Sequence, residues 1–282
     1  ILVVILGNRN PLKTIPWVVV LIFAPVVGLV FYFFFGQDLR RKRIISRRTY
    51  KRLMVYALPA HVRRSDAPVP AACQSLSTLL TNTSQAVSFY GSRLTHYGDG
   101  ASKMTALLEE IEKARDHIHI LYYIFCDDET GARLQQALIR KAKEGVKVRV
   151  LYDDVGCNGV KKEFFQQMRD AGAEVHALLH VRFPMLTDRV NYRNHRKIVV
   201  IDGRIAYTGG VNLSDEYINA EQRFGYWKDA ALRIEGDAAW NFTVMFLNFW
   251  NAFRPSETDY SAFRPQHSAH PVQDGIVQPY AD

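Results

Sequence analysis

The stretch NHRKIVVIDGRIAYTGGVN, residues 194–212, decides how the middle of this 282-residue chain folds. The apolar run 197–201 favours a β-strand, and the dipeptide Asp202-Gly203 is typical of a tight hairpin turn. The segment therefore predicts a strand, a turn and a second strand. Side chains alternate between the two faces of a strand, so we expect His195 and Lys197 to project from the same side.

Strand and helix patterns alternate on both sides of this hairpin. Strands are predicted at 117–126, 146–152, 174–179 and 229–234, and helices at 101–115, 130–144, 160–171 and 238–253. Such alternation predicts an α/β fold, in which a largely parallel or mixed sheet is flanked by helices. The aromatic residues of the last helix are expected mainly in the core.

The N-terminal region is apolar and reads as a membrane anchor. Residues 17–35 contain no charge over nineteen positions, and a helix of that length spans about 28 Å, enough for a bilayer core. Residues 1–6 are also apolar and read as the end of an earlier transmembrane helix, so that 1–35 forms a membrane hairpin. A basic cluster follows instead of a small-residue cleavage site, which argues against a signal peptide.

The excess positive charge lies in one place. The net charge is +8, and residues 40–52 hold eight basic and no acidic side chains, which leaves 28 basic against 28 acidic residues elsewhere. A neutral remainder disfavours a nucleic-acid groove. The cluster favours anionic lipid headgroups, at about 1 kcal/mol per basic residue, and places the following domain in the cytoplasm. Residues 36–90 are predicted to be a basic juxtamembrane linker with a short helix.

The hairpin also contains candidate catalytic residues. A histidine beside a fixed cation can attack phosphorus, with the imidazole as nucleophile and the ammonium holding the phosphoryl oxygens. The spacing of His195, Lys197, Asp202 and the pair Gly209-Gly210 matches the signature of the phospholipase D superfamily. The chain resembles the bacterial cardiolipin synthases of that superfamily in five segments: NYRNHRKIVVIDG, GGVNLSDEYIN, FGYWKDAALRIEG, YYIFCDDETG and EGVKVRVLYDDVG.

This resemblance implies a phospholipase D-like mixed sheet flanked by helices and preceded by the transmembrane hairpin. It also implies a multi-pass protein of the inner, cytoplasmic membrane that transfers a phosphatidyl group between two phosphatidylglycerol molecules, giving cardiolipin and glycerol. The family carries two histidine motifs that share one active site, whereas this sequence holds one H-x-K motif. We therefore expect residues 91–265 to be a first catalytic half-domain and 266–282 the start of a linker. A missing C-terminal half-domain or a second subunit would complete the site.

The resemblance assigns a role to each residue of the motif. His195 is the expected nucleophile, which forms a phosphatidyl-histidine intermediate, and Lys197 is the expected phosphate clamp. Asn212 would donate a hydrogen bond to a phosphoryl oxygen. Gly209 and Gly210 would let the backbone approach the phosphate, because they have no Cβ.

Three acidic residues complete the predicted site. Asp202 belongs to the motif, although its turn position indicates an architectural role. The carboxylate that orients the His195 imidazole is expected to be Asp229, with Glu216 as the competing candidate.

No metal or cofactor is predicted. The pairs Asp127-Asp128 and Asp153-Asp154 follow strands and are interpreted as helix caps or loop residues. Cys73, Cys126 and Cys157 lie far apart and indicate neither a disulfide framework nor a zinc site. Two alternatives stay open: a phospholipase D-type enzyme or nuclease that uses water, and an inactive lipid-binding fragment that holds half of a site.

Overall fold

The computed structural model describes residues 11–32, 69–84, 86–178, 193–223, 225–254, 256, 259–265 and 275–280. The predictions for residues 1–6 and for the basic cluster at 40–52 lie outside these described residues.

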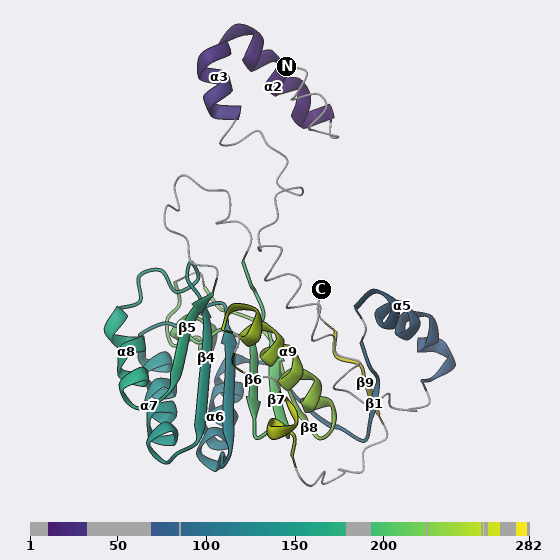
Figure 1. Ribbon diagram of the computed structural model, residues 1–282, viewed down its shortest axis with the longest axis vertical. Helices are drawn as coiled ribbons and strands as arrows, with labels where there is room; N and C mark the ends of the chain where they lie inside the picture. The colour runs from purple at the N-terminus through teal and green to yellow at the C-terminus, as the bar shows by residue number, and fades with distance from the viewer. Residues whose placement is uncertain are drawn as a thin grey trace.

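Among the described residues, seven strands form one mixed sheet in the order β2-β8-β7-β6-β3-β4-β5 (Figure 1). The strands are β2 (Arg93–Tyr97), β3 (His117–Tyr122), β4 (Lys147–Asp153), β5 (Glu174–Leu178), β6 (Ile198–Ile201), β7 (Ile205–Gly209) and β8 (Ala231–Glu235). The pairs β3-β4 and β4-β5 are parallel, and every other pair in this sheet is antiparallel. The mixed α/β sheet predicted from the alternating pattern is confirmed.

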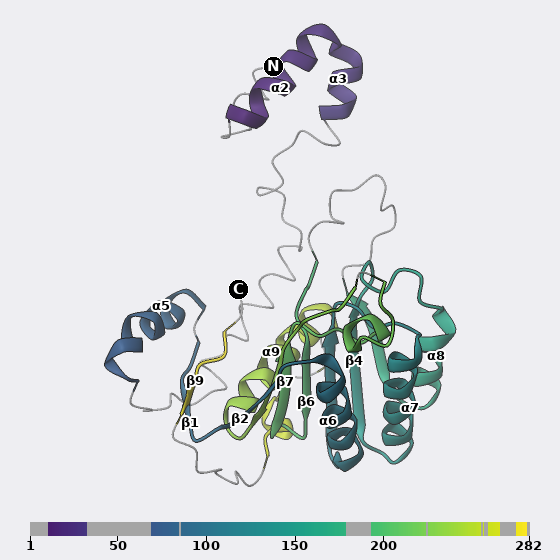
Figure 2. The ribbon, with the colours of Figure 1, turned by 180° about the vertical axis from the view of Figure 1, so that it is seen from behind.

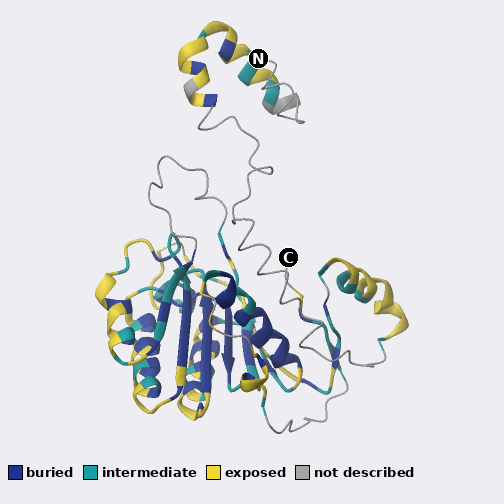
Figure 3. Ribbon diagram, viewed as in Figure 1, coloured by how far each residue is buried: buried dark blue, intermediate teal, exposed yellow. Residues whose placement is uncertain are grey.

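Helices cover both faces of this sheet, as the two opposite views show (Figures 1 and 2). One face packs against α6 (Gly100–Lys113), α7 (Glu129–Lys143) and α8 (Lys162–Asp170), and the other against α9 (Ala238–Phe253). All six residues of β3 are buried for this reason, and the central strands form a continuous buried layer (Figure 3).

Helix α9 has the bounds predicted for it, and it is buried almost all round. Its side chains Trp240, Phe242, Phe246 and Trp250 belong to the core cluster beneath the sheet, whereas Phe249 and Phe253 are partly buried. The core role predicted for the aromatic residues is therefore confirmed for these four buried rings.

The apolar N-terminal segment differs from the single helix expected over 17–35. It forms α2 (Pro11–Phe23) and α3 (Pro25–Phe31), which meet at Ala24. Pro25 has no backbone N–H, and its ring clashes with the preceding turn, so it ends α2 and occupies the start of α3. Within the described ranges, no helix combines the length and the apolar character that a bilayer crossing requires.

The region before the sheet contains the short helix predicted for the linker. It comprises η4 (Ala71–Cys73) and α5 (Gln74–Ser84), followed by β1 (Phe89–Tyr90). Strand β1 pairs antiparallel with β9 (Ile276–Val277), so part of the segment 266–282, predicted to start a second linker, pairs with the region before the sheet. Two short 3-10 helices, η7 (Asp215–Ile218) and η8 (Ser261–Phe263), complete the described elements.

Candidate functional site

His195 and Lys197, the candidate nucleophile and phosphate clamp, lie just before β6 and not on it. The predicted strand began at Lys197, but β6 begins at Ile198, and residues 193–197 have no regular secondary structure. The strand-based reason for placing His195 and Lys197 together is therefore wrong.

Both side chains nevertheless contact one aromatic ring, that of Tyr123, which directly follows β3. The His195 imidazole stacks on Tyr123 with ring centroids 4.0 Å apart and an interplanar angle of 18°. The Lys197 Nζ atom lies 5.6 Å from the same ring centroid and donates a hydrogen bond of 2.8 Å to the His195 carbonyl oxygen. Tyr123 thus brings the two residues together, and no motif in the sequence points to this role.

The imidazole and the ammonium differ in their surroundings. His195 is exposed, whereas Lys197 is half-buried. Burial lowers the pKa of the Lys197 ammonium, and the nearby negative charge of Asp229 opposes that shift. An accessible nucleophile beside a partly desolvated cation is an arrangement suited to attack on a phosphoryl group.

Asp229 lies against the glycine pair that ends β7. A Cβ added at Gly210 would lie 2.0 Å from Asp229 Oδ1, so only glycine leaves room for this carboxylate. Gly209 has a φ of +148°, and its Cβ would lie 2.4 Å from the Ala230 carbonyl oxygen. The structure thus gives both glycines a packing reason that the sequence did not suggest.

Asn212 is 2 % exposed and tied to the backbone after β3. Its Oδ1 accepts a hydrogen bond of 3.2 Å from the Ile124 N–H. The chain around it also pairs with this segment, because the Leu213 N–H donates to the Ile124 carbonyl oxygen. The predicted donation from Asn212 to a phosphoryl oxygen stays a prediction.

Asp202 lies at the opposite end of β6 from His195. It has a φ of 51° and is followed by Gly203 with a φ of 64°, as a type I′ hairpin turn requires. Its carboxylate accepts hydrogen bonds from the backbone N–H groups of Arg115, Asp116 and His117, at 3.0, 2.9 and 3.0 Å. These contacts join the hairpin to the start of β3, and they do not bring Asp202 to His195 and Lys197.

The residue that orients the imidazole is not identified by a contact. Glu216 lies in η7, and its Oε1 atom is buried with no hydrogen-bond partner. Within the described part of the chain, neither Asp229 nor Glu216 makes a hydrogen bond to the His195 imidazole. Both candidates stay predictions.

The acidic pairs after strands divide into two kinds. Asp128 is the N-cap of α7 and accepts a hydrogen bond of 2.9 Å from the Gly131 N–H, so the cap interpretation is confirmed there. Asp153 is neither a cap nor a loop residue. It is the buried last residue of β4 and forms an ion pair of 2.8 Å with Arg193. In the described ranges, no group of three or more His, Cys, Asp or Glu side chains could hold a metal ion.

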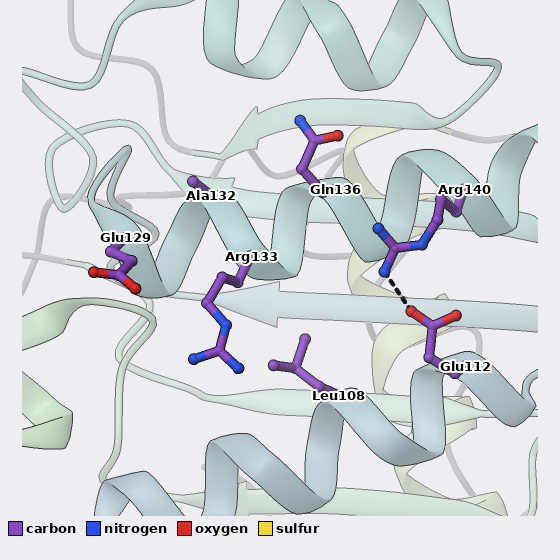
Figure 4. A pocket seen from close by; sticks show the side chains of 7 residues that line it. All are labelled: Leu108, Glu112, Glu129, Ala132, Arg133, Gln136 and Arg140. Atoms are coloured by element: carbon purple, nitrogen blue, oxygen red, sulfur yellow. Dashed lines mark hydrogen bonds and ion pairs between the residues drawn. The ribbon is translucent and has the colours of Figure 1, made fainter.

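A hollow of about 480 Å³ lies between α6 and α7 (Figure 4). It is lined by Leu108, Glu112, Glu129, Ala132, Arg133, Gln136 and Arg140. The Arg140 guanidinium is paired with Glu112 across it, and the Arg133 guanidinium extends toward Leu108. None of the candidate residues of the histidine motif contributes to this lining.

Comparison with known proteins gives consistent matches over the chain. A family model described as "Cardiolipin synthase, PLD-like domain" matches residues 107–231, and one described as "Phospholipase_D-nuclease N-terminal" matches residues 1–37. The major cardiolipin synthase ClsA of Bacillus subtilis (strain 168) is 37% identical over 259 residues, which cover 89% of this chain and 54% of that protein. A cardiolipin synthase of Oceanobacillus iheyensis is 38% identical over 257 residues, covering 88% of this chain and 53% of that protein.

The chain thus spans about half the length of the curated relatives it matches. Among solved structures, NucT from Helicobacter pylori aligns with a TM-score of 0.44 and 18% sequence identity, over 57% of this chain and 97% of that one.

Proposed function

This chain belongs to the bacterial cardiolipin synthases of the phospholipase D superfamily, and from that membership we propose that the protein transfers a phosphatidyl group between two phosphatidylglycerol molecules. The observation that carries this proposal is the cluster of an exposed His195 imidazole and a half-buried Lys197 ammonium on the Tyr123 ring. The cluster lies within the matched domain, where a nucleophile and a phosphate clamp are needed.

The proposed reaction proceeds in two displacements at phosphorus. The His195 imidazole attacks the first phosphatidylglycerol, a P–N bond forms, and glycerol leaves with a proton from a general acid. The hydroxyl of a second phosphatidylglycerol then attacks the phosphatidyl-histidine and returns a proton to that same group, now acting as the base. The P–N bond breaks, which gives cardiolipin and frees the imidazole. Lys197 stabilises the charge on the phosphoryl oxygens, and Asn212 donates a hydrogen bond to one of them. We assign the general acid to a second histidine motif, supplied by a C-terminal half-domain or another subunit.

Asp229 is proposed to hold the imidazole in the tautomer that can attack. A carboxylate that accepts from one imidazole nitrogen leaves the other free as nucleophile. Asp229 lies close enough to Lys197 to affect its pKa and is held over Gly210.

Replacement of Asp229 by asparagine should therefore lower kcat strongly, by about 100-fold or more, since the wrong tautomer would dominate. Cardiolipin formation in membranes that hold the full-length protein measures this effect. The matched control is Glu216→Gln, which should change kcat little. A negligible loss in Asp229→Asn together with a large loss in Glu216→Gln would transfer the orienting role to Glu216.

The site is proposed to work at the surface of the cytoplasmic membrane, because both substrates are bilayer lipids. Residues 1–35 would anchor the protein as a multi-pass hairpin, and residues 40–52 would contact anionic headgroups from the cytoplasmic side. A closed, water-poor site would favour transfer over hydrolysis of the intermediate.

Deletion of residues 40–52 should weaken attachment to anionic bilayers without changing kcat. At about 1 kcal/mol per residue, the eight basic residues set an upper bound on the binding free energy that the cluster contributes. We expect the affinity for anionic vesicles to fall by at least about 100-fold. Cosedimentation with phosphatidylglycerol vesicles measures it, in versions that also lack residues 1–35 so that the apolar anchor does not mask the effect. Neutral phosphatidylcholine vesicles are the control. Equal binding to anionic vesicles with and without the cluster would refute the headgroup role.

Product analysis tests the activity itself. Labelled phosphatidylglycerol supplied to membranes that hold the full-length protein should yield cardiolipin and free glycerol in equal amounts. Phosphatidic acid as the main product would instead identify a hydrolase. The absence of turnover would identify a lipid-binding protein.

A further inference from the structure

We propose that the buried pair Asp153 and Arg193 positions His195 for attack, a role that deepens the proposed function and rests on it. Asp153 is the last residue of β4, and its side chain is fully buried, at 0% exposure. The Arg193 side chain is 3% exposed. Its Nε and Nη2 atoms donate hydrogen bonds of 2.9 and 2.8 Å to Asp153 Oδ1.

The Asp153 carboxylate also accepts hydrogen bonds from two backbone segments, the turn after β4 and the residue before His195. Its Oδ1 accepts from the Val155 and Gly156 N–H groups, both at 3.0 Å. Its Oδ2 accepts from the Asn194 N–H at 3.4 Å. One carboxylate therefore joins the turn after β4 to the two residues that directly precede His195.

This connection matters because residues 193–197 belong to no strand or helix. The hydrogen-bond ladder that fixes neighbouring strands begins only at Ile198, where β6 pairs with β3 and β7. The place of the His195 backbone must then be set by side chains, and the Asp153 carboxylate supplies the contact one residue before it.

The same turn also supports the ring on which the imidazole rests. A Cβ added at Gly156 would lie 2.1 Å from the Tyr123 carbonyl oxygen, so the turn held by Asp153 packs directly on the Tyr123 backbone. Burial raises the pKa of the Tyr123 hydroxyl, and the negative charge of Asp153 raises it further. The pair therefore positions the imidazole in two ways: through the backbone that precedes His195, and through the Tyr123 ring on which the imidazole stacks.

Single substitutions would not separate positioning from folding, because removal of one partner leaves a buried charge unpaired and destabilises the protein strongly. The variant Asp153→Asn with Arg193→Met removes both charges together. It keeps an amide oxygen for the Val155 and Gly156 N–H groups, and Met has the length and flexibility to fill the space of the arginine stem. The matched control replaces exposed residues of the same types, Asp116→Asn with Arg133→Met, where Arg133 lines the hollow in Figure 4.

The experiment compares these variants in full-length protein reconstituted in phosphatidylglycerol membranes. We expect kcat per folded molecule to fall about 100-fold in the double variant, since a displacement of about 1 Å at a nucleophile has that effect, with KM nearly unchanged. A wild-type kcat in the folded double variant would overturn the proposal. If the double variant shows no cooperative thermal transition, Arg193→Lys takes its place. It keeps the charge but loses the two-pronged contact, so a wild-type kcat there would also overturn the proposal.

A second measurement does not depend on turnover. Acylation of His195 by diethyl pyrocarbonate, followed by mass spectrometry of its peptide, reports how the imidazole is held against Tyr123. We expect the rate to rise several-fold in the double variant and to stay at the wild-type value in the control. If wild-type protein makes no cardiolipin, the proposed function fails, and this rate still decides the positioning role. An unchanged rate refutes that role whatever the activity is.

Discussion

Replacement of His195 by alanine should abolish phosphatidyl transfer and lower kcat by at least about 10⁴-fold, with the amount of folded protein unchanged. The chemical reason is that no covalent intermediate can form without the imidazole. The structural reason is that His195 is exposed, and its side chain contacts the protein mainly through the Tyr123 ring, so its loss has little effect on stability. Cardiolipin formation in membranes and a thermal unfolding curve measure the two effects.

The matched control for this variant is His96→Ala, which removes another exposed histidine from β2 at the edge of the sheet. Its rate should equal that of the wild type. A His195→Ala variant that still makes cardiolipin at the wild-type rate would remove the histidine from the mechanism.

Replacement of Asp202 by alanine should have the opposite pattern, a large loss of stability with little loss of chemistry. Three backbone N–H groups would lose their acceptor, and alanine would have to adopt a φ of 51°. Together these changes should lower the free energy of unfolding by about 3 kcal/mol or more. Because β6 separates Asp202 from Lys197, kcat per folded molecule should stay within about threefold of the wild type.

Denaturant unfolding and active-site-normalised rates distinguish these two effects. The conservative variant Asp202→Asn keeps one side-chain oxygen and tolerates the positive φ, so its stability should lie between those of alanine and the wild type. A stable Asp202→Ala protein with greatly reduced kcat would assign Asp202 a direct part in catalysis instead.

The order of elements could be predicted where both faces of a strand are covered. Strand β3 is buried on both sides, so its sequence is a continuous apolar and aromatic run. Such a run predicts a strand even when the neighbouring strands are unknown. Strand β2 was not predicted, since its residues RLTHY are largely exposed at the sheet edge and show no apolar alternation. The single helix over 17–35 is predicted from length and the absence of charge, and neither of these signals the break at Ala24, where Pro25 ends α2.

Only the part of the candidate site that lies within one continuous sequence motif could be predicted. His195 and Lys197 are close in sequence, so their spacing is informative. Arg193 and Asp153 are 40 residues apart, and their contact depends on the end of β4 meeting the segment before β6. From the sequence alone, Asp153 resembles the capping residue Asp128, because each begins or continues an acidic pair after a strand. Burial and the buried arginine distinguish them, and both are properties of the fold.

The most direct test of the central claim is to trap phosphorus on His195. Full-length protein is mixed with phosphatidylglycerol labelled at phosphorus, quenched with alkaline detergent, digested and mapped by mass spectrometry. We predict an acid-labile, alkali-stable phosphatidyl adduct on the peptide that contains His195, and none in the His195→Ala variant. Active protein that never carries label on His195, or that carries it on another residue, would contradict the account.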